Sequence, residues 1–542
     1  MLGAAMKRCP KCRQVYKEDA LKFCRLDGTV LVNSTFAEAE TILFPAGQIS
    51  HSTVQQLPEA TSSLAVLPFN NLSADSAIEY FCDGLAEEIV RALSHIENLK
   101  VVGRQSALSF KGKDVNVREI GKTLNVEAVL EGSVRKSGNR LRITVQLVST
   151  GNGYQLWSER YDREMHDTTS VQNDITHAVI AALQVKLRGQ DRSAVFTRHT
   201  ENSTAHQLYL KGLFHAVRFT AEGFSTGVDY LNKAIAEDPG YALAYVGLAD
   251  AYFHASSIHL RPAEAFIQVK AAAEKALALD EHLAEAHALL AVVAGTYDRK
   301  PAEAERRYKH ALELAPNSVM AHQWYGYHLM TQGRLAAAIG EFSRAHELDP
   351  LCPLLRVLTS VTYFFARQPH RALREARRAI ALSEDYWFGY WSAALAYEQM
   401  GRLVESLAEL DKAEEGGSSP WVTALRSRVY VKLGRREIAE KFCAEASEKA
   451  ATQWVAPYLV ATVYFALDDK ERGFEWLEKA FVDHDEALNF MAVDPVLDAW
   501  RKDPRFIDLL RRTNLEQSNG RTHFVVPVSG PSVSAEHIAY GF

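Results

Sequence analysis

The chain has 542 residues and a formal charge of −6, from 61 basic and 67 acidic side chains. At roughly 150 residues per domain, this length predicts three or four domains. Apolar residues make up 47% and charged residues 24%, values that exclude a wholly disordered or collagen-like chain. A slightly acidic chain has no overall attraction to nucleic acid. No apolar run reaches the roughly 18 residues that cross a bilayer, and the chain start does not have the pattern of a signal peptide, so we expect a cytoplasmic protein without a membrane span.

Three of the six cysteines lie near the start of the chain. Cys9 and Cys12 have the spacing of one knuckle of a structural zinc site. Cys24 and Asp27 repeat this spacing, although aspartate is an uncommon ligand in such sites. We therefore predict a small zinc ribbon over residues 1–32, with zinc as a structural cofactor held by these four side chains. The alternative is a basic flexible arm with incidental thiols.

The next two segments differ in pattern. Residues 33–61 are rich in small and polar side chains with no sustained period, which predicts a linker. Residues 62–190 alternate between strand and helix signals, which predicts a small α/β domain with a sheet on one side and helices on the other. The predicted elements are strands over 64–69, 99–102, 129–134, 141–147 and 154–157, and helices over 85–96 and 169–187.

Four motifs in the α/β region occur in the order typical of the TolB-like N-terminal domain. They are AVLPFNNLS (65–73), EYFCDGL (79–85), LEGSV (130–134) and LWSERYD (156–162). The chain resembles that family over about 125 residues. The resemblance implies an accessory module with no settled catalytic role, of the kind attached to bacterial transcription factors, receptor kinases and nucleotide cyclases.

A period of 34 residues runs through the region 203–482. Pro316 and Pro350 are one period apart, and small residues such as Gly326 and Ala338 fall at the spacings of a helix-turn-helix unit. This pattern is the signature of the tetratricopeptide repeat, whose units bury their apolar faces only by stacking. We count about eight units. Residues 483–515 read as capping helices and 516–542 as a disordered tail.

In this repeat the first helix of each unit faces the concave side of the solenoid. Ten of the twelve predicted inward positions in three successive units are apolar or aromatic, which favours a groove that binds a partner protein. The alternative is that an end helix of the same chain, or the α/β domain, fills the groove. The predicted groove residues are Met320, Gln323, Tyr327, Met330, Leu354, Val357, Val361, Phe364, Phe388, Trp391, Leu395 and Glu398.

The motifs of common enzymes are missing from the sequence. The tripeptide at 121–123 resembles part of a P-loop, but the first glycine is replaced by Asn116 and the surrounding pattern is helical. The kinase signatures and the metalloprotease motif are not present. The remaining thiols, Cys82, Cys352 and Cys443, are isolated and are expected to be small buried groups. These observations predict a protein that is not an enzyme.

The order of domains resembles the C-terminal part of bacterial serine/threonine kinases and adenylate cyclases, with a truncated zinc ribbon in place of the catalytic domain. We therefore predict a scaffold or adaptor in bacterial signalling that binds protein partners in the repeat groove. The alternative is a transcriptional regulator that binds nucleic acid through the zinc ribbon. Nucleic acid is disfavoured, because a net charge of +4 over residues 1–32 is a weak electrostatic footprint.

Overall fold

A computed structural model gives the fold of the chain, which divides into two compact units, Met1–Glu59 and Ala60–Phe542. The described residues are 6–8, 15–16 and 32–34 in the first unit, and 62–73, 75, 78–164, 169–183, 200–216, 220–256, 260–415, 419–451 and 454–516 in the second. In the first unit, β1 (Met6–Arg8) pairs antiparallel with β2 (Val15–Tyr16) and β3 (Val32–Ser34). The predicted ligands Cys9, Cys12, Cys24 and Asp27 lie outside the described residues, as do the linker from 35 to 61 and the tail from 517 onward.

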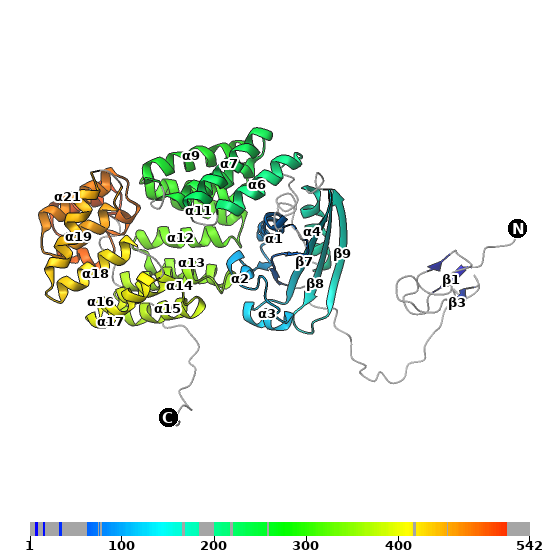
Figure 1. Cartoon of the computed structure of the whole chain (residues 1–542), viewed down its shortest axis with the longest axis horizontal. Helices are drawn as coiled ribbons and strands as arrows, with labels where there is room; N and C mark the ends of the chain where they lie inside the picture. Colours follow the sequence, from blue (N-terminus) through cyan, green and yellow to red (C-terminus); the bar gives the residue numbers. More distant parts are fainter. Residues whose placement is uncertain are drawn as a thin grey trace, which may run out of the picture. The chain divides into compact units, whose positions relative to one another are not determined.

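The second unit begins with an α/β domain (Figure 1). Its sheet has the strand order β6-β4-β7-β8-β9, and β5 pairs with β7 at one side of this path. Strands β4, β6 and β7 run parallel, whereas β7, β8 and β9 form an antiparallel meander. The strands are β4 (Ser63–Val66), β5 (Asn70–Asn71), β6 (Lys100–Val101), β7 (Ala128–Ser137), β8 (Arg140–Ser149) and β9 (Gln155–Glu164). The helices are α1 (Glu79–Ser94), α2 (Arg104–Leu108), α3 (Val117–Leu124) and α4 (Thr169–Ala182).

Both faces of the parallel part of the sheet are covered. Leu64 and Val66 of β4 belong to the same buried cluster as Ile89 of α1, whereas Ala65 packs in a second cluster with Ile120 of α3. The expectation that helices cover a single face was therefore wrong at this end of the sheet. The reason is that a central parallel strand is buried on both faces, and β4 accordingly reads as a continuous apolar run rather than an alternating one.

The repeat region confirms the predicted helical repeats. In the described residues, sixteen helices form eight consecutive pairs, from α6/α7 to α20/α21, and the two helices of each pair pack against each other (Figure 1). The first four pairs are α6 (Ser203–Ala216) with α7 (Ala221–Glu237), α8 (Ala242–Ala255) with α9 (Pro262–Leu279), α10 (Ala284–Val292) with α11 (Pro301–Leu314), and α12 (Val319–Thr331) with α13 (Leu335–Leu348). The other four are α14 (Pro353–Phe365) with α15 (Pro369–Leu382), α16 (Trp387–Gln399) with α17 (Leu403–Glu415), α18 (Pro420–Lys432) with α19 (Arg436–Lys449), and α20 (Pro457–Ala466) with α21 (Lys470–Val482).

In six of the repeats, from α10/α11 to α20/α21, the turn between the two helices contains a residue with positive φ. The predicted turn glycines Gly333 and Gly401 have φ of 69° and 74°, as expected for the residue type that adopts this conformation at least cost. The same conformation recurs every 33 or 34 residues even where glycine is absent. The six positions are Arg299, Gly333, Arg367, Gly401, Gly434 and Asp468.

The segment after the last repeat differs from the expected pair of capping helices. It contains two short 3-10 turns, η3 (Glu486–Phe490) and η4 (Pro495–Trp500), and one helix, α22 (Pro504–Arg512). An aspartate accepts a backbone N–H bond at the start of each element, so each start is capped by a carboxylate. The three capping residues are Asp485, Asp494 and Asp503.

Candidate functional site

The predicted groove residues lie on three successive first helices, α12, α14 and α16, as the repeat pattern requires. Seven of the twelve side chains are buried: Met330, Val357, Val361, Phe364, Trp391, Leu395 and Glu398. Met320, Gln323, Tyr327, Leu354 and Phe388 are half-buried. The structure therefore brings the predicted set onto neighbouring helices but leaves little of it exposed to solvent.

A C-terminal segment of the same chain lies against these repeats. We call residues 485–500 the closing segment. Phe490 in this segment packs among aromatic rings from three different repeats. Its ring centroid lies 5.5 Å from that of Tyr327 on α12, 5.3 Å from Phe365 on α14 and 6.4 Å from Trp421 on α18. We call the surface formed by these three side chains and their neighbours on the first helices the inner face.

Two arginines at the positive-φ turns hold the C-terminal region in place. Arg367 donates hydrogen bonds to the carbonyl oxygen of Val493 (2.6 Å) and to the carboxylate of Asp498 (2.6 Å). Arg299 donates to the carbonyl oxygen of Phe481 (2.6 Å), with its guanidinium 3.7 Å from the centre of that ring. The sequence analysis missed both arginines, because the repeat signature at this position is a glycine.

Charged groups are buried under the closing segment. The predicted groove residue Glu398 pairs with Arg428 of α18 at 2.6 Å, and both are buried. Burial alone would raise the pKa of Glu398, but Arg428 and Lys432 hold it below its usual value. Glu398 therefore balances a cation of the neighbouring repeat, a pairing across 30 residues that the inward-facing pattern did not reveal.

Two aspartates of the closing segment bond to Tyr458 at the start of α20. The Tyr458 hydroxyl donates to the carboxylate of Asp494 (2.8 Å), and the Tyr458 backbone N–H donates to the carboxylate of Asp485 (2.8 Å). Burial raises the pKa of Asp485 to about 7, with smaller opposing effects from the backbone donors. The closing segment is thus held by a ring cluster, by Arg367 and by two capping carboxylates.

Loops of two successive repeats bind the α/β domain. Asp349, after α13, accepts a hydrogen bond from the backbone N–H of Ser106 (2.7 Å) and a second from its hydroxyl group. Asn317, after α11, donates to the carbonyl oxygens of Ile96 (2.8 Å) and Leu99 (3.1 Å). Because these bonds are buried and come from two successive repeats, the α/β domain is fixed to the repeats rather than tethered to them.

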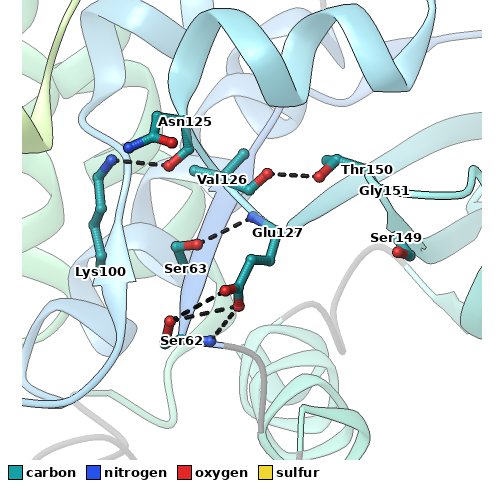
Figure 2. Close-up of a pocket in the computed structure, with 9 residues that line it drawn as sticks. All are labelled: Ser62, Ser63, Lys100, Asn125, Val126, Glu127, Ser149, Thr150 and Gly151. Carbon is teal, nitrogen blue, oxygen red and sulfur yellow. Dashed lines mark hydrogen bonds between the residues drawn. The ribbon is translucent and has the colours of Figure 1, made fainter. Parts of the chain in front are cut away.

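A pocket of about 490 Å³ lies where β4, β6 and β7 begin (Figure 2). Its charged groups bond to the surrounding backbone rather than to each other. The Lys100 ammonium donates to the Asn125 carbonyl oxygen (3.0 Å), and the Glu127 carboxylate accepts from the backbone N–H of Ser62 (2.8 Å). Figure 2 shows both bonds along the pocket wall. These polar groups tie the strand ends together, and burial lowers the pKa of Lys100.

The three cysteines of the second unit are buried free thiols. Burial raises the pKa of Cys82, Cys352 and Cys443 to about 12, 11 and 12, so all three are neutral thiols in the interior. Across the described ranges, no three His, Cys, Asp or Glu side chains are arranged to hold a metal ion. Within these same ranges, none of the helices is both long and apolar enough to cross a membrane.

Comparison with known proteins relates the chain to bacterial regulators. The family model for the second domain of HilA/YgeH-like transcriptional regulators matches residues 60–178, the α/β domain. Putative adenylate cyclase 3 of Rhizobium meliloti (strain 1021) is 37% identical over 194 residues, 36% of this chain. The chain spans only 33% of that cyclase. Transcriptional regulator HilA of Salmonella typhimurium is 22% identical over 478 residues, which cover 83% of this chain and 78% of the regulator.

Solved structures give partial matches. Pseudomonas aeruginosa PilF is 21% identical, with a TM-score of 0.32, over 40% of this chain and 94% of its own. A tetratricopeptide repeat protein from Parabacteroides merdae is 16% identical, with a TM-score of 0.31, over 57% of this chain and 99% of its own.

Proposed function

We propose that the chain is a non-enzymatic, cytoplasmic scaffold in bacterial regulation, in which the inner face of the repeats binds an aromatic-bearing segment of a partner protein. The observation that carries the proposal is the position of Phe490. One aromatic side chain of a segment made mainly of 3-10 turns packs among rings from three repeats, which supports the binding of a partner segment in the same place. In the free chain, the closing segment takes the place of the partner.

The partner therefore has to displace the closing segment. Because the closing segment is part of the same chain, its effective concentration at the inner face is high. A partner that displaces it must therefore bind the inner face more tightly than would be needed to displace the same segment as a separate peptide. Weakening the closing segment should strengthen partner binding. This direction of effect distinguishes competition at the inner face from binding elsewhere on the surface.

The test is quantitative affinity capture from native lysate with matched variants. Phe490→Ala should increase the amount of captured partner, because it loosens the closing segment without altering the repeats. Tyr327→Asp should lower capture, since it places a charge on the inner face. Val404→Asp, at an exposed site on α17, is the control and should leave capture unchanged. Equal capture by all four proteins, with helical content unchanged by circular dichroism, would exclude the inner face.

We also propose that residues 62–190 form a TolB-like domain and that residues 1–32 form a zinc ribbon. The four sequence motifs support the first assignment, as does the match of this region to the second domain of transcriptional regulators. The ligand spacing supports the second. Purified full-length protein should contain one zinc ion per chain, and Cys9→Ser should abolish it. Wild-type protein without metal, purified without chelator, would refute the zinc ribbon.

The second candidate function is regulation of transcription through nucleic-acid binding. Similarity to transcriptional regulator HilA over 478 residues favours it. A salt-dependent gel shift with full-length protein, lost when residues 1–59 are deleted, would support this function, because that segment forms a separate compact unit. A shift that survives the deletion would place nucleic-acid binding in the second unit instead.

A further inference from the structure

An aromatic pocket lies between the inner face and the closing segment. Its volume is about 140 Å³, and it adjoins the ring cluster around Phe490, with which it shares Tyr327. Three of its walls are the rings of Phe253 on α8, Tyr308 on α11 and Trp324 on α12. Tyr327 supplies the fourth ring, and Glu486 of the closing segment supplies a carboxylate.

Neighbouring rings in this pocket are set at steep angles to one another. The centroids of Phe253 and Trp324 are 4.7 Å apart, with an angle of 86° between the ring planes. Trp324 and Tyr327 are 5.7 Å apart, with an angle of 69°. Rings in this arrangement cannot stack, and they form the adjoining walls of a box. The face of an aromatic ring carries negative electrostatic potential, so a box of this kind attracts a cation that needs few hydrogen bonds.

The polar groups that line the pocket also favour a cationic ligand. Glu486 is the one lining side chain, in the described part of the chain, that carries a carboxyl group, and the hydroxyl of Ser256 donates a hydrogen bond to it. Burial lowers the pKa of His328, another lining residue, to about 4, so its imidazole is neutral near pH 7. A negative wall opposes an anionic ligand and favours a positive one.

The volume of the pocket limits the size of the group that it can bind. A dry cavity of roughly 150 Å³ takes up a molecule of six carbon atoms, so a pocket of about 140 Å³ suits a group of five or six heavy atoms. A trimethylammonium group with its attached methylene carbon is of this size. It also has no N–H groups, so it does not require the hydrogen-bond acceptors that aromatic walls lack.

The backbone beside the pocket is irregular. The segment η2 (Val293–Tyr297) is a π-helical turn that continues α10, and its residues Gly295 and Thr296 line the pocket. Turns of this type inside helices are frequent at functional sites. The pocket therefore combines a distorted helix, an aromatic box and a fixed carboxylate.

We propose that this pocket binds a methylated ammonium group, contributed either by a small solute of the choline type or by a methylated lysine side chain of a protein. The rings belong to the repeats and the carboxylate belongs to the closing segment, so the ligand contacts both and stabilises the closed arrangement. This inference does not depend on partner binding at the inner face.

Calorimetric titration of the full-length protein tests the proposal. Choline and a peptide containing trimethyllysine are the two cationic probes, and 3,3-dimethylbutan-1-ol is the uncharged probe with the shape of choline. We expect at least one cationic probe to bind on the order of tenfold more tightly than the uncharged one, a difference of about 1.4 kcal/mol. Binding of choline alone would identify a small solute, and binding of the peptide alone would identify a protein side chain. No binding of either cation, or equal binding of the uncharged probe, would overturn the proposal.

Matched variants locate the binding site. Glu486→Gln should weaken cation binding on the order of tenfold, because it removes the charge and keeps the size of the side chain. Glu313→Gln, at an exposed site on α11, is its control and should have no effect. Tyr327→Phe keeps the aromatic ring and should bind the cation as the wild type does. Tyr327→Leu removes the ring and should weaken cation binding. Unchanged binding by Glu486→Gln and Tyr327→Leu would exclude this pocket.

Discussion

Arg367 and Gly333 occupy equivalent turns one repeat apart, and both have a positive φ, 57° for the arginine and 69° for the glycine. An L-residue with a side chain is strained in this conformation by about 1 kcal/mol or more relative to glycine. The strained arginine is also the residue that binds Val493 and Asp498 in the closing segment. The same holds for Arg299, whose φ is 57° and whose guanidinium bonds to Phe481. Backbone strain in two turns is thus offset by contacts to the C-terminal region.

The first prediction concerns the backbone strain at these turns and the contacts that offset it. Asp468→Gly should stabilise the protein by up to about 1 kcal/mol, since the strained Asp468 (φ 61°) becomes a glycine. Arg367→Gly relieves the same strain but removes two hydrogen bonds, each worth roughly 0.5–3 kcal/mol, so it should fail to stabilise and should loosen the closing segment. Urea unfolding and amide exchange over residues 485–500 measure both effects. Equal stabilisation by the two variants would show that the arginine contacts contribute nothing.

The second prediction concerns the pH dependence of the protein's folding stability. Since the folded pKa of Asp485 is raised from 3.8 to about 7, the folded protein binds an extra proton between about pH 4 and 7. The stability that this residue contributes is therefore greatest below pH 4 and falls as pH rises toward 7, by at most roughly 4 kcal/mol. Burial is the main cause, and the nearby carboxylates Glu486 and Asp483 add to it.

The variant Asp485→Asn isolates this contribution. Asparagine is a good N-cap and has no titrating carboxyl group, so the stability of the variant should lack this pH dependence. The difference in unfolding free energy between the variant and the wild type, measured by urea titration from pH 4.5 to 7.5, should grow in favour of the variant as pH rises. A difference that does not change with pH would contradict the raised pKa.

The third prediction tests close packing inside one repeat. A Cβ atom at Gly326 would lie 2.7 Å from Cε1 of Phe342, so Gly326→Ala should destabilise the protein by about 1–3 kcal/mol. Gly340 is the matched control, because a Cβ atom there meets nothing within 4 Å. Gly340→Ala, in the middle of α13, should stabilise by about 1 kcal/mol through helix propensity. Thermal unfolding of both variants should give shifts of opposite sign, and shifts of the same sign would argue against this packing.

The fourth prediction concerns the contact between the α/β domain and the repeats. Asp349→Ala leaves the buried backbone N–H of Ser106 without its acceptor and should cost about 1–3 kcal/mol. Because the lost bonds join the two parts, we expect the variant to unfold in two steps and the wild type to unfold in one. Differential scanning calorimetry distinguishes the two cases. A single transition in the variant, with unchanged midpoint, would mean that this bond does not couple the parts.

The sequence predicted local and periodic features better than contacts between distant segments. The 34-residue spacing of Pro316 and Pro350 was sufficient to identify the helical repeats, and strand alternation identified β8. The turns at Arg299 and Arg367 were missed, because their conformation is imposed by the repeat and not by the residue type. The apolar pattern on α12, α14 and α16 predicted a groove that binds a partner, but it carried no information about which segment covers these helices.

The most direct test of the account is amide exchange over residues 485–500, measured by mass spectrometry with and without the captured partner. If the partner binds the inner face by displacing the closing segment, exchange over these residues should accelerate on binding, while exchange on α12, α14 and α18 should stay slow. If residues 485–500 remain as protected with the partner as without it, the partner binds elsewhere and the inner face is only the interior of the fold.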